Sequence, residues 1–180
     1  GTNKAVTANY SISGTDAANY NLIQPTGLSA DIFQRTLNAS LTANDKVYDA
    51  TAIATGSFGD DRVGGDVLTI NGTSTFDNKN VGTNKNVTAS DLSLSGTDAL
   101  NYVLASTTVN DTADITQASL IVSGAAAQNK IYDATTTATV TGGSVTGLAS
   151  DVVTLGAANA IFDNKNVGVG KTVNTNFTLT

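Results

Sequence analysis

Two blocks of the sequence return in nearly the same form further along the chain, and this internal repetition constrains the fold more than any other feature. The block Lys-Val-Tyr-Asp-Ala-Thr at residues 46–51 returns as Lys-Ile-Tyr-Asp-Ala-Thr at residues 130–135. The block Phe-Asp-Asn-Lys-Asn-Val-Gly at residues 76–82 returns unchanged at residues 162–168. Self-similarity at a nearly fixed spacing indicates tandem copies of one structural unit.

Matches near the two ends of the chain set the limits of the repeat. Gly-Thr-Asn-Lys at residues 1–4 is identical to residues 82–85, and the segment before Gln34 matches the segment before Gln117. The sequence therefore predicts parts of a repeat of about 83 residues. They are the C-terminal part of a preceding repeat at residues 1–34, a complete repeat at residues 35–117, and the N-terminal part of a following repeat at residues 118–180. We accordingly expect the sequence to come from a longer chain.

Composition and pattern favour strands within each repeat. Thr and Val are β-branched and fit a pleated, half-buried surface, while Asn, Asp and Gly supply turns. No segment carries a sustained helical period of apolar residues. We therefore expect an all-β fold made of tandem immunoglobulin-like β-sandwich repeats. The strands expected in the complete repeat are residues 37–42, 52–57, 67–70, 74–76, 87–94, 102–105 and 108–115.

A third recurring block predicts a structural tyrosine. Gly-Thr-Asp-Ala-x-Asn-Tyr contains Asp98 and Tyr102 in the complete repeat, and Asp16 and Tyr20 in the first segment. This spacing is that of a tyrosine corner, in which the hydroxyl of a Tyr at a strand start bonds to backbone a few residues upstream. We expect all four side chains to have a structural role.

These three blocks together resemble the YDG domain, and the resemblance covers the entire chain. The family implies tandem copies in very large bacterial exoproteins of the filamentous haemagglutinin type and in similar adhesins. It implies no catalytic activity and supplies no active-site residues. The Gly that gives the family its name is replaced by Ala50 and Ala134, from which we expect that the turn after the aspartate does not require a positive φ.

Several classes of function are excluded by composition. The chain has no His and no Cys, which rules out the usual Ser-His-Asp and Cys-His arrangements. A net charge of −6, with nine cations scattered singly, argues against nucleic-acid binding. The longest apolar runs are too short to span a bilayer, so no membrane insertion is expected from this segment. We expect a protein that is not an enzyme.

The acids of the loop at residues 59–66 are the candidates for metal binding. Asp60, Asp61 and Asp66 lie close in sequence and could offer oxygen ligands to Ca²⁺. The spacing matches no EF-hand, and paired carboxylates for glycosidase-like chemistry are the remoter alternative. Otherwise these side chains belong to a solvated loop. No cofactor is expected, with Ca²⁺ as the one alternative.

The Tyr-Asp pairs of the first block have two interpretations. Tyr48 with Asp49, and Tyr132 with Asp133, could present an aromatic ring and an acid to a carbohydrate. Because both copies keep the pair, we favour a structural role, with the ring buried and its hydroxyl bonded. Asp77 and Lys79, with their counterparts in the next copy, are predicted to stabilise a turn by Asx-type backbone bonds.

Together these observations predict a structural stalk or filament repeat of a bacterial secreted or surface-anchored adhesin, which extends or assembles the fibre in adhesion or biofilm formation. Its partners would be neighbouring repeats and other copies in a filament. One alternative is a module that binds glycan or the surface of a host or partner cell through its variable loops. Another is a filament subunit that polymerises by strand complementation, because residues 1–34 and 118–180 together more than complete one repeat. In each case the expected location is extracellular.

Overall fold

The protein is all-β in the computed structural model, which describes residues 1–156 and 158–180. The described residues form strands and two short 3-10 turns, and no α-helix. None of them forms a helix long and apolar enough to cross a membrane. The chain divides into two compact units, and each contains segments from different parts of the sequence. The first comprises Gly1–Ala43, Thr55–Ser74 and Thr88–Asp111, and the second comprises Asn44–Ala54, Thr75–Val87 and Thr112–Thr180.

The first unit contains most of the strands of the complete repeat. β3 and β9 pair in parallel, and β4 pairs antiparallel with β6 from Ala39 opposite Asp60 to Ala43 opposite Gly56. Its elements are β1 (Lys4–Ala5), η1 (Ala17–Asn19), β2 (Ser29–Ala30), β3 (Arg35–Leu37), β4 (Ala39–Ala43), β6 (Gly56–Asp60), η2 (Ala99–Asn101), β9 (Tyr102–Leu104) and the larger parts of β7 (Thr69–Phe76) and β8 (Gly82–Ser95).

The second unit contains the segment 118–180. Ser123 pairs with Ser144 here as Ala39 pairs with Asp60 in the complete repeat, so both partners are shifted by 84 positions. This segment therefore repeats the β4–β6 pairing with an unchanged register. The elements of the unit are β5 (Lys46–Val47), β11 (Ser123–Ala127), β12 (Val140–Ser144), β13 (Asn159–Phe162), β14 (Val173–Asn176) and parts of β7, β8 and β10 (Val109–Thr116).

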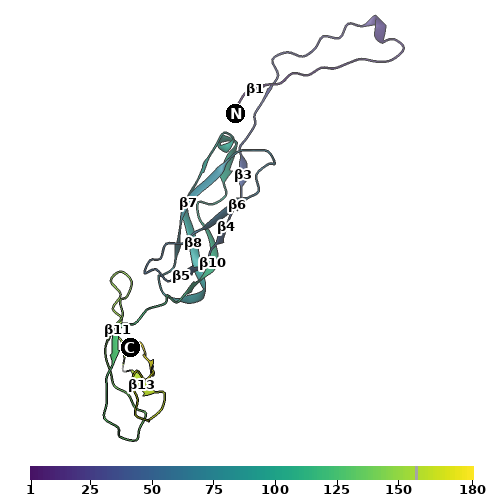
Figure 1. The fold of residues 1–180 in the computed structure, drawn as a ribbon. Coiled ribbons are helices and arrows are strands. Elements are labelled where there is room, and N and C mark those ends of the chain that lie inside the picture. The colour runs from purple at the N-terminus through teal and green to yellow at the C-terminus, as the bar shows by residue number, and fades with distance from the viewer. Residues whose placement is uncertain (157) are drawn as a thin grey trace. The chain divides into compact units, whose positions relative to one another are not determined.

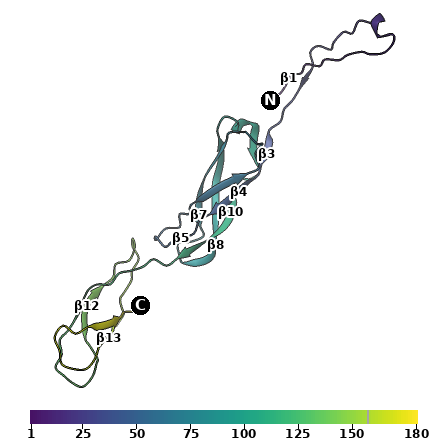
Figure 2. The ribbon, with the colours of Figure 1, turned by 45° about the vertical axis from the view of Figure 1, so that its right-hand side comes forward.

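The largest sheet has four strands in the order β5-β10-β8-β7. Its long strands run side by side in both Figure 1 and Figure 2. Six of the seven expected strands lie on observed ones, although two of these join into the single strand β7. The strand expected at residues 52–57 is wrong in position, because β6 begins only at Gly56. Residues 49–55 instead form a turn with a single bridge from Ile53 to Thr75.

Buried apolar side chains concentrate in the complete repeat. Leu37 and Val87 are fully buried, and Ile115 is 1% exposed. Outside residues 35–117 the described residues place only Ala160 in this buried apolar class. In the first unit the buried residues are Leu37, Leu41, Leu68, Ile70, Ala89, Leu92 and Tyr102, and in the second they are Ala54, Phe76, Val87, Ala113, Ile115 and Ala160.

A change of phase inside β8 keeps apolar side chains on the buried face. Val87 and Ala89 are buried at alternate positions, but the next buried residue is Leu92. Asp91, between them, has φ of 55°, a left-handed conformation that introduces one extra residue, as a β-bulge does. The extra residue turns Leu92 to the buried side, where a strict alternation would place Asp91.

The first 34 residues form a long, open hairpin. Two extended stretches lie side by side and are joined through the turn at η1 (Figure 1). β1 and β2 contribute only two residue pairs, and the side chain of Gln24 closes two further bonds with the backbone of Tyr10. Tyr20, Ile32 and Phe33 are all largely exposed, so this segment has strand pairing without a core.

Candidate functional site

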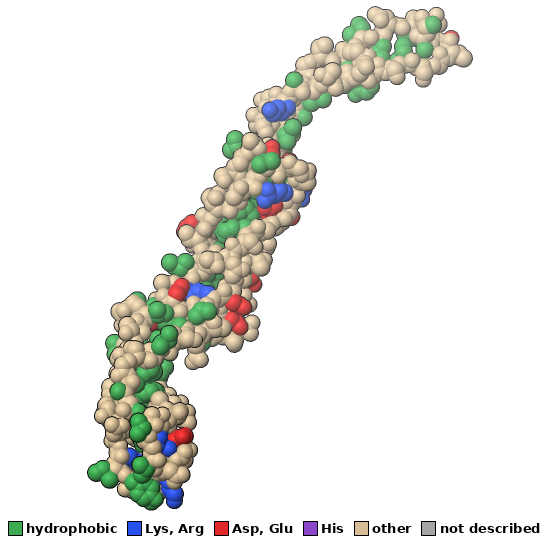
Figure 3. Space-filling view, in the orientation of Figure 1, with side chains coloured by type: hydrophobic (Ala, Val, Ile, Leu, Met, Phe, Trp, Pro, Cys, Tyr) green, Lys and Arg blue, Asp and Glu red, His purple; other side chains and the backbone are tan. Residues whose placement is uncertain are grey.

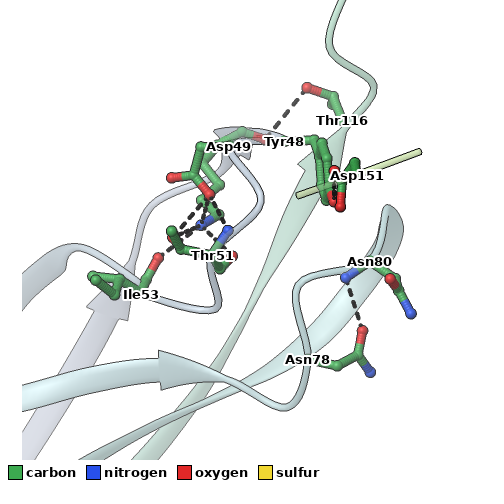
Figure 4. Close-up of polar contacts among 9 residues, drawn as sticks. Tyr48, Asp49, Thr51, Ile53, Asn78, Asn80, Thr116 and Asp151 are labelled. Carbon is green, nitrogen blue, oxygen red and sulfur yellow. Dashed lines mark hydrogen bonds and ion pairs between the residues drawn. The ribbon is translucent and has the colours of Figure 1, made fainter. Parts of the chain in front are cut away.

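A lysine surrounded by oxygen atoms lies at the centre of the first recurring block. Lys46 Nζ lies 2.8 Å from Asp49 Oδ1 and 2.9 Å from each of the carbonyl oxygens of Thr51 and Ile53. It also lies 5.6 Å from the centroid of the Phe76 ring, a cation–π distance. In Figure 4 the dashed bonds to Asp49, Thr51 and Ile53 converge inside the turn that follows Tyr48. The lysine therefore cross-links a loop that has few ladder bonds of its own.

The next copy builds the same arrangement. Lys130 Nζ lies 2.7 Å from Asp133 Oδ1 and 3.0 Å from the carbonyl oxygens of Thr135 and Thr137, with the Phe162 ring at 5.7 Å. Such identical bonding in two copies fits a structural role for Asp49 and Asp133, but Tyr132 is 56% exposed, so the expectation that its ring is buried is wrong.

The aspartates of these turns are held in the ionised form. Hydrogen bonds from Lys46, and then from the backbone and hydroxyl of Thr51, lower the pKa of Asp49 to about 2. The equivalent bonds from Lys130 and Thr135 lower the pKa of Asp133 to about 2. A carboxylate stays charged where bonds to its ionised form outweigh desolvation.

The alanine that replaces glycine after each aspartate is strained. Ala50 has φ of 66° and Ala134 has φ of 64°. The expectation that this turn tolerates alanine without a positive φ is therefore wrong. A Cβ in the left-handed region approaches the following carbonyl oxygen, and the lysine-centred bonds on either side hold the backbone there despite that cost.

The hydroxyl of Tyr48 reaches the following repeat. It donates a hydrogen bond to Asp151 Oδ2, while Lys79 Nζ lies 2.5 Å from Asp151 Oδ1. Lys79 Nζ also lies 5.7 Å from the centroid of the Tyr48 ring. Tyr48 and Asp151 lie side by side in Figure 4. We call these three side chains the junction cluster, because two belong to the predicted repeat 35–117 and one to the repeat after it.

The side chains of the junction cluster stabilise one another's charged forms. Lys79, followed by Tyr48, lowers the pKa of Asp151 by hydrogen bonding to its carboxylate. Asp151, followed by Tyr48, raises the pKa of Lys79. The side chains of Lys79 and Asp151 are 40% and 22% exposed, so dissolved salt screens part of this attraction. The cluster holds two chain segments together and contains no activated nucleophile.

The sequence did not identify the junction cluster. Lys79 was predicted to stabilise its own turn, but its ammonium contacts Asp151 instead. The turn is stabilised by Asn78, whose side chain accepts a bond from the Asn80 amide, and Asp77 accepts a bond from the Asn78 amide. One feature of the sequence could have indicated Asp151. It is the one acidic residue in its loop, and it aligns with Asp66 of the preceding copy.

The Tyr102 hydroxyl bonds to a loop that is distant in the sequence. The expected tyrosine corner is therefore wrong about the partner of this hydroxyl, which was predicted to be backbone a few residues upstream. The hydroxyl accepts a hydrogen bond from the Val63 amide at 2.9 Å and donates one to Asp66 Oδ2 at 2.5 Å. Asp98 adds a bond from the Val67 amide at 2.8 Å. The pair thus holds the loop at residues 63–67 against the start of β9.

The tyrosine of the same motif in the first segment is exposed. Tyr20 is 74% exposed, whereas Tyr102 is 4% exposed. Asp16 accepts a backbone bond from Asn19 within the 3-10 turn, as Asp98 does from Asn101. The motif therefore forms its local turn in both places, and in residues 35–117 the tyrosine ring is also buried.

The three acids proposed for Ca²⁺ separate onto different protein partners. Asp60 pairs with Arg62 at 2.5 Å, Asp61 accepts two bonds from Asn38, and Asp66 accepts the Tyr102 hydroxyl. Asp61 and residues 63–65 are exposed, as expected for a solvated loop, but the Asp60 side chain is only 3% exposed. No group of three potential metal-ligating side chains occurs among the residues described.

These features define the chain as a tandem-repeat β protein whose lysine-centred turn is bonded in the same way in two consecutive copies. Two segments, residues 34–109 and 116–180, match the YDG domain. The chain belongs to the YDG domain family. No curated protein matches the chain, and no solved structure matches it.

Proposed function

We propose that these repeats are spacer units of a stalk or filament, in which one YDG repeat follows another at a fixed spacing. The parent protein would be a bacterial adhesin of the filamentous haemagglutinin type, secreted or anchored at the cell surface. The repeat would be an immunoglobulin-like sandwich without enzymatic activity. Two consecutive family matches in one chain support the tandem arrangement.

The junction cluster is the observation that carries this proposal. Asp151 receives the Tyr48 hydroxyl and the Lys79 ammonium from the preceding repeat. A carboxylate held by two donors fixes both distance and direction better than one exposed ion pair. In an array in which each repeat contacts only its neighbours, regular junctions of this kind add up to a defined length.

Small-angle X-ray scattering tests the spacer function. We would compare the present chain with chains lengthened by one and two whole repeats. The maximum dimension should grow by a constant increment for each repeat added. Asp151→Asn, which removes the charge at the junction, should broaden the distance distribution. Asp163→Asn is the matched control, because Asp163 pairs with Lys171 inside its own repeat.

Two results would contradict the proposal. Compact particles whose maximum dimension does not grow with repeat number would exclude a spacer. Saturable binding of a single repeat to immobilised glycans, lost on changes in the loop at residues 60–66, would support a ligand-binding module in its place.

A further inference from the structure

The four-stranded sheet of the complete repeat ends at β7, and most of the outer edge of this strand is open. β7 comes last in the order β5-β10-β8-β7. Its outer side has one bridge, from Ile53 to Thr75. Next to that bridge the Phe76 amide donates to the Ala52 carbonyl oxygen at 2.8 Å. Among the residues that the structure describes, no strand pairs with residues 69–74 on this side.

The bond of Phe76 shows which backbone groups of β7 point outward. Its N–H points away from β8, and the direction of the backbone N–H and C=O groups alternates along a strand. The amides of Ile70, Gly72 and Ser74 therefore point to the open side as well. The edge thus presents three amides in a row to a further strand.

β7 lacks the features that usually protect an open edge. Edge strands are commonly very short, or they carry charged residues or proline. β7 has eight residues, and none of them is charged or a proline. The opposite edge of the same sheet, β5, has only two residues, and one of them is Lys46. The exposed side chains beside the open amides of β7 are those of Asn71 and Thr73, and both are uncharged.

Two copies of this edge can approach each other without bringing like charges together. Charged side chains form small, separate groups on the face drawn in Figure 3, with uncharged surface between them. Gly72 lies against Ser90 and Leu92 of β8, so Asp91 is the charge of that strand next to the open stretch. In a pair of β7 strands the two Asp91 residues would be three strand spacings apart, about 14 Å, which exceeds the Debye length of about 8–10 Å.

We propose that β7 of one copy pairs antiparallel with β7 of a second copy, which joins two chains side by side about a two-fold axis at Gly72. Ile70 then lies opposite Ser74 of the second copy, and this register uses all three outward amides. Asn71 lies opposite Thr73 of the second copy at a pair without hydrogen bonds. This association goes beyond the spacer function and does not depend on it.

The pairing adds backbone hydrogen bonds without displacing a strand. When a strand is added to an open edge, main-chain hydrogen bonds supply the affinity. A two-fold axis repeats each of these bonds, because the same surface of both copies takes part. Each bond contributes little after water has been displaced, so we expect a weak and reversible dimer.

Disulfide trapping tests the register directly. The chain has no cysteine, so Asn71→Cys and Thr73→Cys each introduce one thiol at an exposed position. In a mixed pair the two thiols lie opposite each other, with Cα atoms about 4.5 Å apart, whereas identical thiols lie on a diagonal of about 7–8 Å. A disulfide spans only the shorter separation. Under mild oxidation, a mixture of the variants should give at least tenfold more mixed dimer than dimer of either variant alone.

Sedimentation equilibrium of the unmodified chain is the second measurement. The mean mass should rise with concentration between the micromolar and millimolar ranges. Thr73→Lys places a charge beside the open edge and should weaken the association at least tenfold. Thr112→Lys is the matched control, because Thr112 is exposed on β10, an interior strand of the same sheet. This control should leave the association unchanged, and both variants should keep the melting temperature of the unmodified chain.

Three results would overturn the proposal. They are a monomer throughout that concentration range, equal yields of mixed and like dimers, and equal effects of the two lysine variants on the association. The growth of the maximum dimension with each added repeat would remain valid in every one of these cases, so the spacer function is tested separately.

Discussion

The complete repeat and the first segment contain the same tyrosine motif in different surroundings. Tyr102 is 4% exposed and bonds to the loop at residues 63–67, whereas Tyr20 is 74% exposed. Both motifs form the same 3-10 turn. The comparison teaches that the motif encodes its local turn by itself, while the burial of the ring depends on strands and a loop that come from the other end of the repeat.

The largest expected difference is in the cores. Ile115→Ala should lower the free energy of unfolding by about 2–4 kcal/mol, because it leaves a cavity among buried side chains. Ile32→Ala, at the equivalent position, should change it by less than about 0.5 kcal/mol at micromolar concentration. Urea unfolding followed by circular dichroism measures both. Equal losses would mean that residues 1–34 bury Ile32 within a single chain.

Removing the hydroxyl group should affect thermal stability at Tyr102 and not at Tyr20. Tyr102→Phe leaves the Val63 amide and Asp66 without their partner, so the melting temperature should fall by a few degrees. Tyr20→Phe should leave it unchanged. Hydrogen exchange at the Val63 amide should accelerate only in the first variant. Unchanged exchange there would show that the hydroxyl does not hold the loop.

Acid titration compares the two lysine-centred turns. The pKa of Asp49 is about 2 in the folded protein against an ordinary value of 3.8. A lowered folded pKa contributes stability above the ordinary value, and this stability is lost as the pH falls toward the folded value. The melting temperature should therefore decline between about pH 4 and pH 2. Asp49→Asn should flatten this decline in the main transition, and Asp133→Asn should not. An identical pH profile for Asp49→Asn and the parent chain would contradict the assignment.

Restoring glycine in the strained turns should give the smallest effect. Ala50→Gly should raise the free energy of unfolding by about 1 kcal/mol, because glycine adopts the left-handed conformation without a Cβ contact. Ala134→Gly should not alter the main transition, since its repeat lacks a core of comparable burial. A destabilising Ala50→Gly would show that the alanine side chain contributes packing that outweighs its strain.

Local patterns predicted part of the fold. The strands expected at residues 87–94 and 108–115 lie on β8 and β10, because burial on one face of a strand imposes a period of two that the sequence shows. The two-residue strand β5 was missed, since so short an element carries no period. Strand β6 begins later than expected because the backbone before it belongs to the turn around Lys46, whose ammonium donates to the Ile53 carbonyl oxygen.

Contacts between residues distant in the sequence are the part of the site that the sequence did not predict. The internal repeats predicted a structural role for Tyr48 and Asp49, because the same pattern recurred. They did not reveal that Tyr48 and Lys79 meet Asp151, since that contact joins positions that are not equivalent in the repeat. Similarly, the Asp-x-x-x-Tyr spacing predicted a structural role for Tyr102. It could not predict the partner Asp66, which lies in a loop outside the motif.

The parallel pairing of β3 with β9 has a consequence for how the chain folds during synthesis. Arg35, at the start of the repeat, pairs with Tyr102, near its end. Pairings between distant positions form late, because a long loop must close before they contribute any stability. β3 is synthesised first, and it stays unpaired with β9 until nearly the whole repeat has left the ribosome. Each repeat should therefore fold in one late step, and a slowly translated repeat would leave its opening strand available to the wrong neighbour.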